Sequence, residues 1–90
     1  MSKESGVIYC IENNINGKKY VGQTINLRQR WSKHKRRLKK GRHDNSHLQN
    51  SFDKHGEKNF KFRVLEEVVK EKLNEREVYW IDVLDSFNSG

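Results

Sequence analysis

The sequence predicts an α+β domain in which a small three-stranded antiparallel β-sheet is flanked by helices. Three patterns favour this class: an Asn-Gly pair between two short apolar runs, three segments with helical periodicity, and one segment in which apolar and basic residues alternate. In chain order these patterns give β-β-α-α-β-α. The length of 90 residues suits one domain, which we expect to occupy residues 1–90 as a part of a longer protein.

The first two strands are predicted over residues 7–12 and 18–23, joined by a turn at Asn16-Gly17. An Asn-Gly pair between apolar runs is a strong hairpin signal, because both residues accept a positive φ. From Phe60 to Val64, apolar side chains alternate with basic ones, which is typical of a half-buried third strand.

Three helices are predicted over residues 26–40, 46–55 and 70–84. Thr24 or Asn26 is expected to cap the start of the first helix, and a glycine follows each of the first two helices. Their apolar stripes contain Leu27, Trp31 and Leu38 in the first, Leu48 and Phe52 in the second, and Leu73, Trp80, Ile81 and Leu84 in the third. We expect these stripes to dock on the sheet.

Charge is concentrated in one part of the chain. The net charge is +7, and residues 28–42 hold nine Lys and Arg and no acid, whereas residues 64–85 hold seven acids and three bases. Such a cluster favours a polyanionic partner. A membrane is excluded as this partner, because the basic helix also carries core residues and no apolar run approaches about 20 residues. Nucleic-acid binding is assigned to Lys33, Arg36, Arg37, Lys40 and Arg42.

Several polar side chains could form a site next to this basic helix. Tyr9 and Tyr20 lie on neighbouring predicted strands, and phenols can transfer protons when nearby cations lower their pKa. Helical spacing places Arg30 and His34 along one side of the first helix, where a guanidinium could stabilise a phosphate and an imidazole could move a proton. His43 is a second histidine candidate. Each of these residues could also be an ordinary strand, surface or turn residue.

Glu77 lies within the apolar stripe of the last predicted helix. A carboxylate that faces a core is costly unless it is paired or binds a metal. The alternatives are therefore a salt bridge to Arg30 or a sheet lysine, and a ligand for one divalent metal ion. The single cysteine, Cys10, is expected to be a buried packing residue in a reducing cytoplasm.

The motifs, in order and at this spacing, resemble those of the GIY-YIG nucleases, and most closely the catalytic domains of phage-type homing endonucleases encoded in group I introns. The resemblance covers residues 6–90. It rests on Val7-Ile8-Tyr9, Tyr20-Val21-Gly22, Arg30-Trp31-Ser32-Lys33-His34, Gly41-Arg42-His43, Phe52-Asp53-Lys54-His55-Gly56 and Glu75-Arg76-Glu77-Val78-Tyr79-Trp80-Ile81. Val7 stands where the first motif of the family has glycine.

The resemblance implies an endonuclease that hydrolyses DNA phosphodiesters with one Mg²⁺ or Mn²⁺ ion. It implies that Glu77 binds the metal, that Arg30 stabilises the phosphate, and that His34 and His43 assist proton transfer. Tyr9 and Tyr20 would line the site, one of them acting as the base, with the choice between them open.

Two alternatives remain at this stage: a basic nucleic-acid-binding module without catalysis, and a repair or restriction nuclease of the same family. We expect a monomer in a bacterial or phage-infected cell. Because no recognition module is evident in the sequence, we expect a DNA-recognition domain after Gly90.

Overall fold

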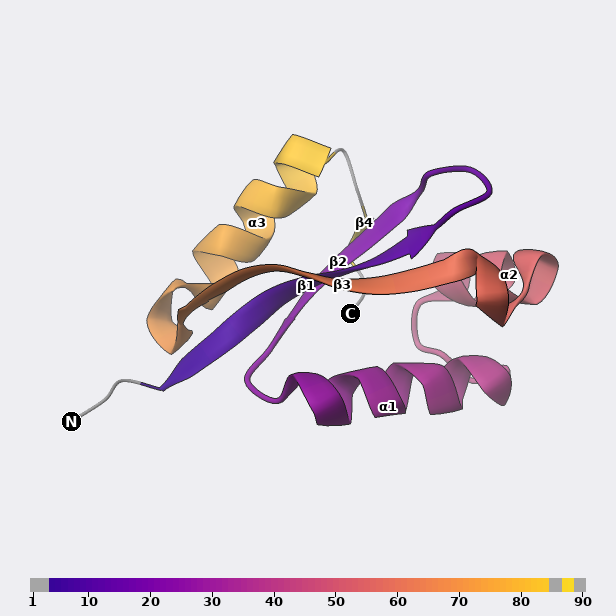
Figure 1. The fold of residues 1–90 in the computed structure, drawn as a ribbon, viewed down its shortest axis with the longest axis horizontal. Helices are drawn as coiled ribbons and strands as arrows, with labels where there is room; N and C mark the ends of the chain where they lie inside the picture. Colours follow the sequence, from indigo (N-terminus) through magenta and orange to yellow (C-terminus); the bar gives the residue numbers. More distant parts are fainter. Residues whose placement is uncertain (1–3, 85–86, 89–90) are drawn as a thin grey trace.

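The computed structural model describes residues 4–84 and 87–88, and it confirms the predicted order of strands and helices, with one short strand added (Figure 1). The elements are β1 (Ser5–Asn13), β2 (Lys19–Thr24), α1 (Leu27–Lys39), α2 (Ser46–His55), β3 (Phe60–Val69), α3 (Leu73–Leu84) and β4 (Phe87–Asn88). Short 3₁₀ helices, η1 (Glu57–Asn59) and η2 (Lys70–Lys72), precede β3 and α3. No helix within the described ranges is long and apolar enough to span a bilayer.

The sheet has the strand order β3-β1-β2-β4. The three predicted strands pair antiparallel, with β1 in the centre. A fourth strand, β4, was not predicted, and it pairs parallel with β2 beside Tyr20 and Val21. Two residues carry no periodicity that a sequence pattern could reveal.

The first hairpin is wider than predicted. Instead of a two-residue turn at Asn16-Gly17, the loop between β1 and β2 spans residues 14–18, and the Asn13 N–H donates to the Lys18 carbonyl at 2.9 Å. The buried Asn13 side chain also accepts a hydrogen bond from the Ile15 N–H at 2.8 Å, which starts the turn early. Gly17 has a φ of 73°, so the glycine requirement at this position was predicted correctly.

Strand β3 is twice as long as the predicted third strand. It pairs with β1 as far as Val69, and the register shifts between Ile8 and Tyr9, where Ile8 lies opposite Glu66 and Tyr9 opposite Val64. Leu65 is therefore the extra residue of a β-bulge. The bulge breaks the alternation of side chains, which is why the pattern identified only the first half of the strand.

The capping residues set the helix boundaries. Asn26, rather than Thr24, caps α1, and its side chain accepts the Gln29 N–H at 3.1 Å. Helix α1 ends at Lys39, and Gly41 follows it with a φ of 69°. Helix α2 covers the predicted residues between the Asn45 cap and Gly56. Helix α3 begins later than predicted, because residues 70–72 form a 3₁₀ turn.

The sheet separates two apolar clusters, because successive residues of a strand face opposite sides. Helices α1 and α2 cover one face and α3 covers the other (Figure 1). The first cluster contains Tyr9, Ile11, Tyr20, Leu38, Leu48 and Phe60. The second contains Ile8, Val21 and Leu73, with Leu65, Val68, Trp80, Ile81 and Leu84 packed against it. Cys10 is buried in β1, as predicted.

Gly6 is the position at the start of β1 where a side chain does not fit. A Cβ atom there would lie 2.8 Å from the Thr24 carbonyl oxygen and 2.9 Å from Leu73 Cδ1. The close approach of β1, β2 and α3 therefore requires glycine at residue 6, and the neighbouring Val7 is accommodated in the strand.

Candidate active site

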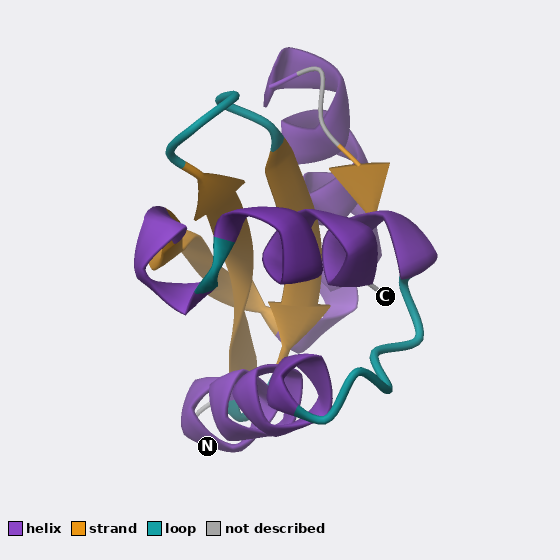
Figure 2. Cartoon of the chain, turned by 90° about the vertical axis from the view of Figure 1, so that its right-hand side faces the viewer, coloured by secondary structure: helices purple, strands orange, loops and turns teal. Residues whose placement is uncertain are grey.

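Three of the predicted site residues form a line of hydrogen bonds from β1 through α1 to the loop before α2. The Tyr9 hydroxyl lies 2.7 Å from His34 Nε2, and His34 Nδ1 lies 2.6 Å from His43 Nε2. The two imidazole rings stack with centroids 4.8 Å apart. Tyr9 is fully buried and His34 nearly so. The loop that carries His43 runs along one side of the molecule (Figure 2). We call this line of three side chains the tyrosine–histidine relay.

Both histidines of the relay are held in the neutral form. Burial lowers the pKa of His34 to about 4, and the charges of His43, Arg30, Lys33 and Arg37 act in the same direction. Burial also lowers the pKa of His43, partly offset by Asp44. Neutral imidazoles have one donor and one acceptor nitrogen, so the relay can carry a directed hydrogen-bond chain at neutral pH.

Tyr20 lies in the same apolar cluster as Tyr9, as expected for two tyrosines on neighbouring strands. Its hydroxyl group has a different environment, because it lies 3.2 Å from Ser51 Oγ on α2. The two phenols thus contact different helices: Tyr9 contacts a histidine of α1, and Tyr20 contacts a serine of α2. This difference separates two residues that the sequence motifs treat alike.

Glu77 is buried on α3, with 8% of its surface exposed. The Gln23 side chain on β2 donates from Nε2 to Glu77 Oε2 at 2.6 Å and to Asn74 Oδ1 at 2.6 Å. Within the described residues Glu77 forms no ion pair, so the alternative of a salt bridge to Arg30 or a sheet lysine is wrong. A neutral amide therefore holds this buried carboxylate in place.

Arg30 connects the two parts of the site. It lines a cavity of about 520 Å³ together with Gln23, Asn74 and Glu77. It also lines a second depression of about 380 Å³ with Gln29, Ser32, Lys33 and Arg36. The relay lies on the α1 face of the sheet and Glu77 on the α3 face, and Arg30 lies where the two faces meet at the end of β2.

The residues assigned to nucleic-acid binding extend from this site along α1. Lys40, Arg36 and Arg42 are exposed, and Lys33 and Arg37 are partly exposed. Arg37 donates to Asp44 at 2.6 Å. Of the five, the other four form no ion pair with any residue that the structure describes. Their charges are therefore available to a polyanion along the side of α1 that carries Arg30.

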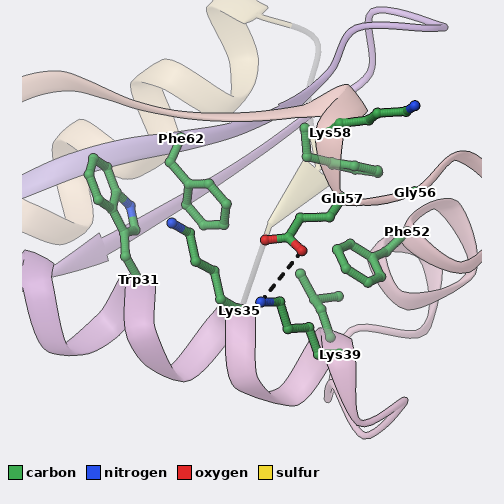
Figure 3. Close-up of a pocket in the computed structure, with 10 residues that line it drawn as sticks. Trp31, Lys35, Lys39, Phe52, Gly56, Glu57, Lys58 and Phe62 are labelled. Atoms are coloured by element: carbon green, nitrogen blue, oxygen red, sulfur yellow. Dashed lines mark ion pairs between the residues drawn. The ribbon is translucent and has the colours of Figure 1, made fainter.

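A larger pocket lies elsewhere, between α1 and the start of β3, and contains none of the predicted catalytic residues. Its volume is about 820 Å³, and Trp31 and Phe62 line it (Figure 3). Lys39 forms an ion pair with Glu57 across it at 3.5 Å. Because Arg30 and Glu77 both line the smaller cavity, we place the candidate active site there.

Three residues near the site were not predicted: Gln23 and Ser51, which contact Glu77 and Tyr20, and Asn74, which accepts a hydrogen bond from Gln23. Neutral amides and hydroxyls are common on surfaces and carry no charge pattern, and nothing in their spacing distinguishes them. The position of Gln23 directly after the Tyr20-Val21-Gly22 motif was the available signal.

Comparison with known proteins identifies the family. The family described as the GIY-YIG catalytic domain matches residues 5–89. Intron-associated endonuclease 1 of Enterobacteria phage T4 is 44% identical over 85 residues, which are 92% of this chain and 34% of that protein. The chain thus spans about a third of the length of this curated relative.

Comparison with solved structures points to the same family. The catalytic domain of homing endonuclease I-TevI superposes with a TM-score of 0.85 at 37% identity, covering 94% of this chain and 98% of that one. A point mutant of the same catalytic domain gives a TM-score of 0.84 at 37% identity, covering 96% and 94%. These matches confirm the predicted fold, and the family implies a divalent metal ion. The chain belongs to the GIY-YIG family of endonuclease catalytic domains.

Proposed function

We propose that this chain is the catalytic domain of a homing endonuclease and hydrolyses DNA phosphodiesters with one divalent metal ion at Glu77. The observation that carries the proposal is the cavity that Arg30 shares with Glu77. It combines a cation for phosphate oxygens with a carboxylate for a metal, beside a basic helix. The similarity to an intron-associated endonuclease favours homing over repair or restriction.

The residues around Glu77 fit a hard cation. Glu77 and Asn74 each present an oxygen atom beside the Gln23 amide nitrogen, and oxygen is the ligand that Mg²⁺ and Mn²⁺ prefer. Mg²⁺ is commonly bound through one or two carboxylates, with water and substrate phosphate completing its coordination. Glu77 would therefore hold one Mg²⁺ or Mn²⁺ ion. Such an ion supplies Lewis-acid stabilisation of charge on the phosphate and on the leaving oxygen.

Arg30 is assigned to the scissile phosphate. Its guanidinium presents several N–H donors in a plane that matches two phosphate oxygens. Charge on these oxygens increases as the attacking water approaches phosphorus, so a fixed cation stabilises the transition state more than the ground state.

Tyr9 is assigned to proton transfer, and Tyr20 to lining the site. The attacking water forms the new bond to phosphorus and gives a proton to the Tyr9 phenolate oxygen, which becomes a neutral phenol, while the bond to the leaving oxygen breaks. His34 hydrogen-bonds that phenol and His43 holds His34, so the relay orients Tyr9 and supports the charge on its oxygen. The Tyr20 hydroxyl lies 3.2 Å from Ser51 Oγ.

DNA affinity is assigned to Lys33, Arg36, Arg37, Lys40 and Arg42, which contact the backbone without reading bases. We assign target recognition to another part of a longer protein, expected after Gly90, because the curated relative is about three times as long as this chain. We further propose a monomer that acts in the cytoplasm of a bacterial or phage-infected cell.

Nicking of a supercoiled plasmid tests the proposed function. The wild type should nick in Mg²⁺ and stop nicking in EDTA, and Arg30→Ala should abolish nicking while it keeps the fold and most of the DNA affinity. Lys61→Ala is a control for the loss of one positive charge, because Lys61 is exposed on β3. Nicking by Arg30→Ala at the rate of Lys61→Ala would reject the assignment of Arg30, and metal-independent nicking would reject the assignment of the metal.

A further inference from the structure

Gln49 is a buried polar residue that no sequence motif singled out. It lies on α2 with 8% of its surface exposed. Its Oε1 accepts the backbone N–H of His43 at 3.0 Å. Its Nε2 donates to the Leu38 carbonyl at 3.0 Å and to Asp53 Oδ1 at 2.8 Å. One side chain thus ties the end of α1, the His43 loop and α2 together.

The amide of Gln49 has only one possible orientation. A backbone N–H can only donate and a backbone carbonyl can only accept, so the oxygen must face His43 and the nitrogen must face Leu38. A buried amide with these fixed partners resists rotation, because a flipped amide would leave both backbone groups unsatisfied. The backbone of His43 is therefore held at a defined position relative to α1.

The position of His43 determines which way the hydrogen bonds of the relay point. The Asn45 N–H donates to His43 Nδ1 at 3.0 Å, so Nδ1 carries no proton and neutral His43 has its proton on Nε2. His43 Nε2 therefore donates to His34 Nδ1, and neutral His34 has its proton on Nε2. His34 Nε2 then donates to the Tyr9 oxygen.

A donated hydrogen bond stabilises the phenolate form of a tyrosine more than its neutral form. With the opposite tautomers, Tyr9 would instead give its own hydrogen to His34, and its oxygen would be a poorer acceptor of a proton from water. The Asn45 N–H thus sets the tautomer of His43, and Gln49 sets the position of the His43 backbone. Together they determine whether Tyr9 can act as a base.

We propose that Gln49 is a positioning residue that holds His43 against Asn45, so that the tyrosine–histidine relay points its hydrogen bonds toward the Tyr9 oxygen. This inference rests on the proposed role of Tyr9 as the base. Gln49 touches neither the substrate nor the metal; it acts through His43.

The test compares Gln49→Leu with Asn50→Leu, a matched control in which the same side chain is introduced at the next, exposed position of α2. Nitrogen NMR of the imidazole rings at neutral pH, without DNA or metal, reports which ring nitrogen carries the proton. In the wild type and in Asn50→Leu we expect the Nε2–H form of both His34 and His43. In Gln49→Leu we expect a mixture of the two forms.

Plasmid nicking gives the second measurement. In Gln49→Leu, kcat should fall about 10- to 100-fold, the range typical of partners that orient a functional histidine, with KM and DNA affinity unchanged. Gln49→Glu is nearly isosteric with the wild type, and it is the variant to measure if Gln49→Leu does not fold. Its ionised carboxylate repels the Leu38 carbonyl, so it should show the same loss.

Wild-type nicking by a folded Gln49→Leu, or unchanged histidine tautomers in both Gln49 variants, would overturn the inference. The NMR measurement requires no activity, so it decides on the position and direction of the relay even if the proposed nuclease function fails. If the tautomers change but kcat does not, Gln49 orients the histidines without serving the reaction, and the inference is wrong.

Discussion

Two neutral amides hold side chains of the candidate active site in place. Gln23 binds the Glu77 carboxylate and Gln49 holds the loop of His43. The ionisable residues could be predicted from the sequence, because a glutamate in an apolar stripe and an arginine–histidine pair on one helix face are recognisable patterns. The roles of the two amides could not be predicted, because they depend on tertiary contacts. Gln23 contacts a residue 54 positions away in the sequence, and Gln49 contacts one six positions away.

The geometry also distinguishes Tyr9 from Tyr20. Both were predicted to lie in the site, since both lie on neighbouring predicted strands near a basic helix. Their partners, His34 and Ser51, come from two helices whose packing cannot be derived from strand motifs. The sequence therefore left the choice of base open, and the hydrogen bond of Tyr9 to a buried histidine now favours Tyr9.

Burial of His34 should make the domain acid-sensitive. The pKa of His34 is about 4 in the folded protein against an ordinary 6.5, so the unfolded chain binds this proton more readily. The stability contributed by neutral His34 is thus complete above about pH 6.5 and is lost as the pH falls toward 4. Burial of His43 acts in the same direction.

Urea unfolding of the wild type and of His34→Gln, over a series of pH values, measures this effect. The free energy of unfolding should decrease below about pH 6.5 in the wild type, and less steeply in His34→Gln, which has one titrating histidine fewer. Parallel pH curves for the two proteins would show that His34 is not the source of the acid sensitivity.

At the scale of elements, capping residues made the helices more predictable than the strands. Helix α2 has its predicted bounds because Asn45 and Gly56 mark both ends. Strand β3 was only half recognised because a bulge and two adjacent acids, Glu66 and Glu67, interrupt its alternation. Glu66 accepts hydrogen bonds from Trp80 and Arg76 of α3, so this acid joins β3 to α3. A contact between two elements cannot be recognised from the local sequence pattern of either one.

The junction of β1, β2 and α3 should depend on Gly6. A methyl group there would lie closer to the Thr24 carbonyl oxygen than Cβ atoms normally approach, and backbone atoms cannot move aside without moving the strand. Gly6→Ala should therefore lower the free energy of unfolding by about 1–3 kcal/mol. Ser5→Ala, at the exposed neighbouring position, is the control for thermal or urea unfolding. Equal stability of the two variants would contradict the close packing at Gly6.

The molecule as a whole places its two reactive groups on opposite faces of one thin sheet. The relay packs with α1 and Glu77 packs with α3, and Arg30 lies at the end of β2 where both are near. This arrangement needs only one layer of helices on each face, which a chain of 90 residues can supply. The family matches agree with this three-layer organisation.

The charge distribution of the whole molecule predicts weak, sequence-tolerant and salt-dependent DNA binding. Residues 28–42 hold nine Lys and Arg and no acid. Each neutralised phosphate should contribute about −0.9 to the slope of log K against log salt concentration. Titration of a labelled DNA duplex measures this slope, and a binding constant that stays flat between about 50 and 200 mM salt would reject the basic helix as the DNA-binding surface.

We propose that the buried carboxylate of Glu77 on α3 holds the catalytic metal. Plasmid nicking by Glu77→Gln is the decisive measurement. The substitution is nearly isosteric and relieves a buried negative charge, so folding should be intact and the melting temperature equal or higher. Nicking in Mg²⁺ or Mn²⁺ should fall by several orders of magnitude, since an amide is a poor ligand for a hard cation. Glu75→Gln, at an exposed position of the same helix, should nick like the wild type. A lower melting temperature with largely unchanged nicking would show that Glu77 is structural and would contradict the account.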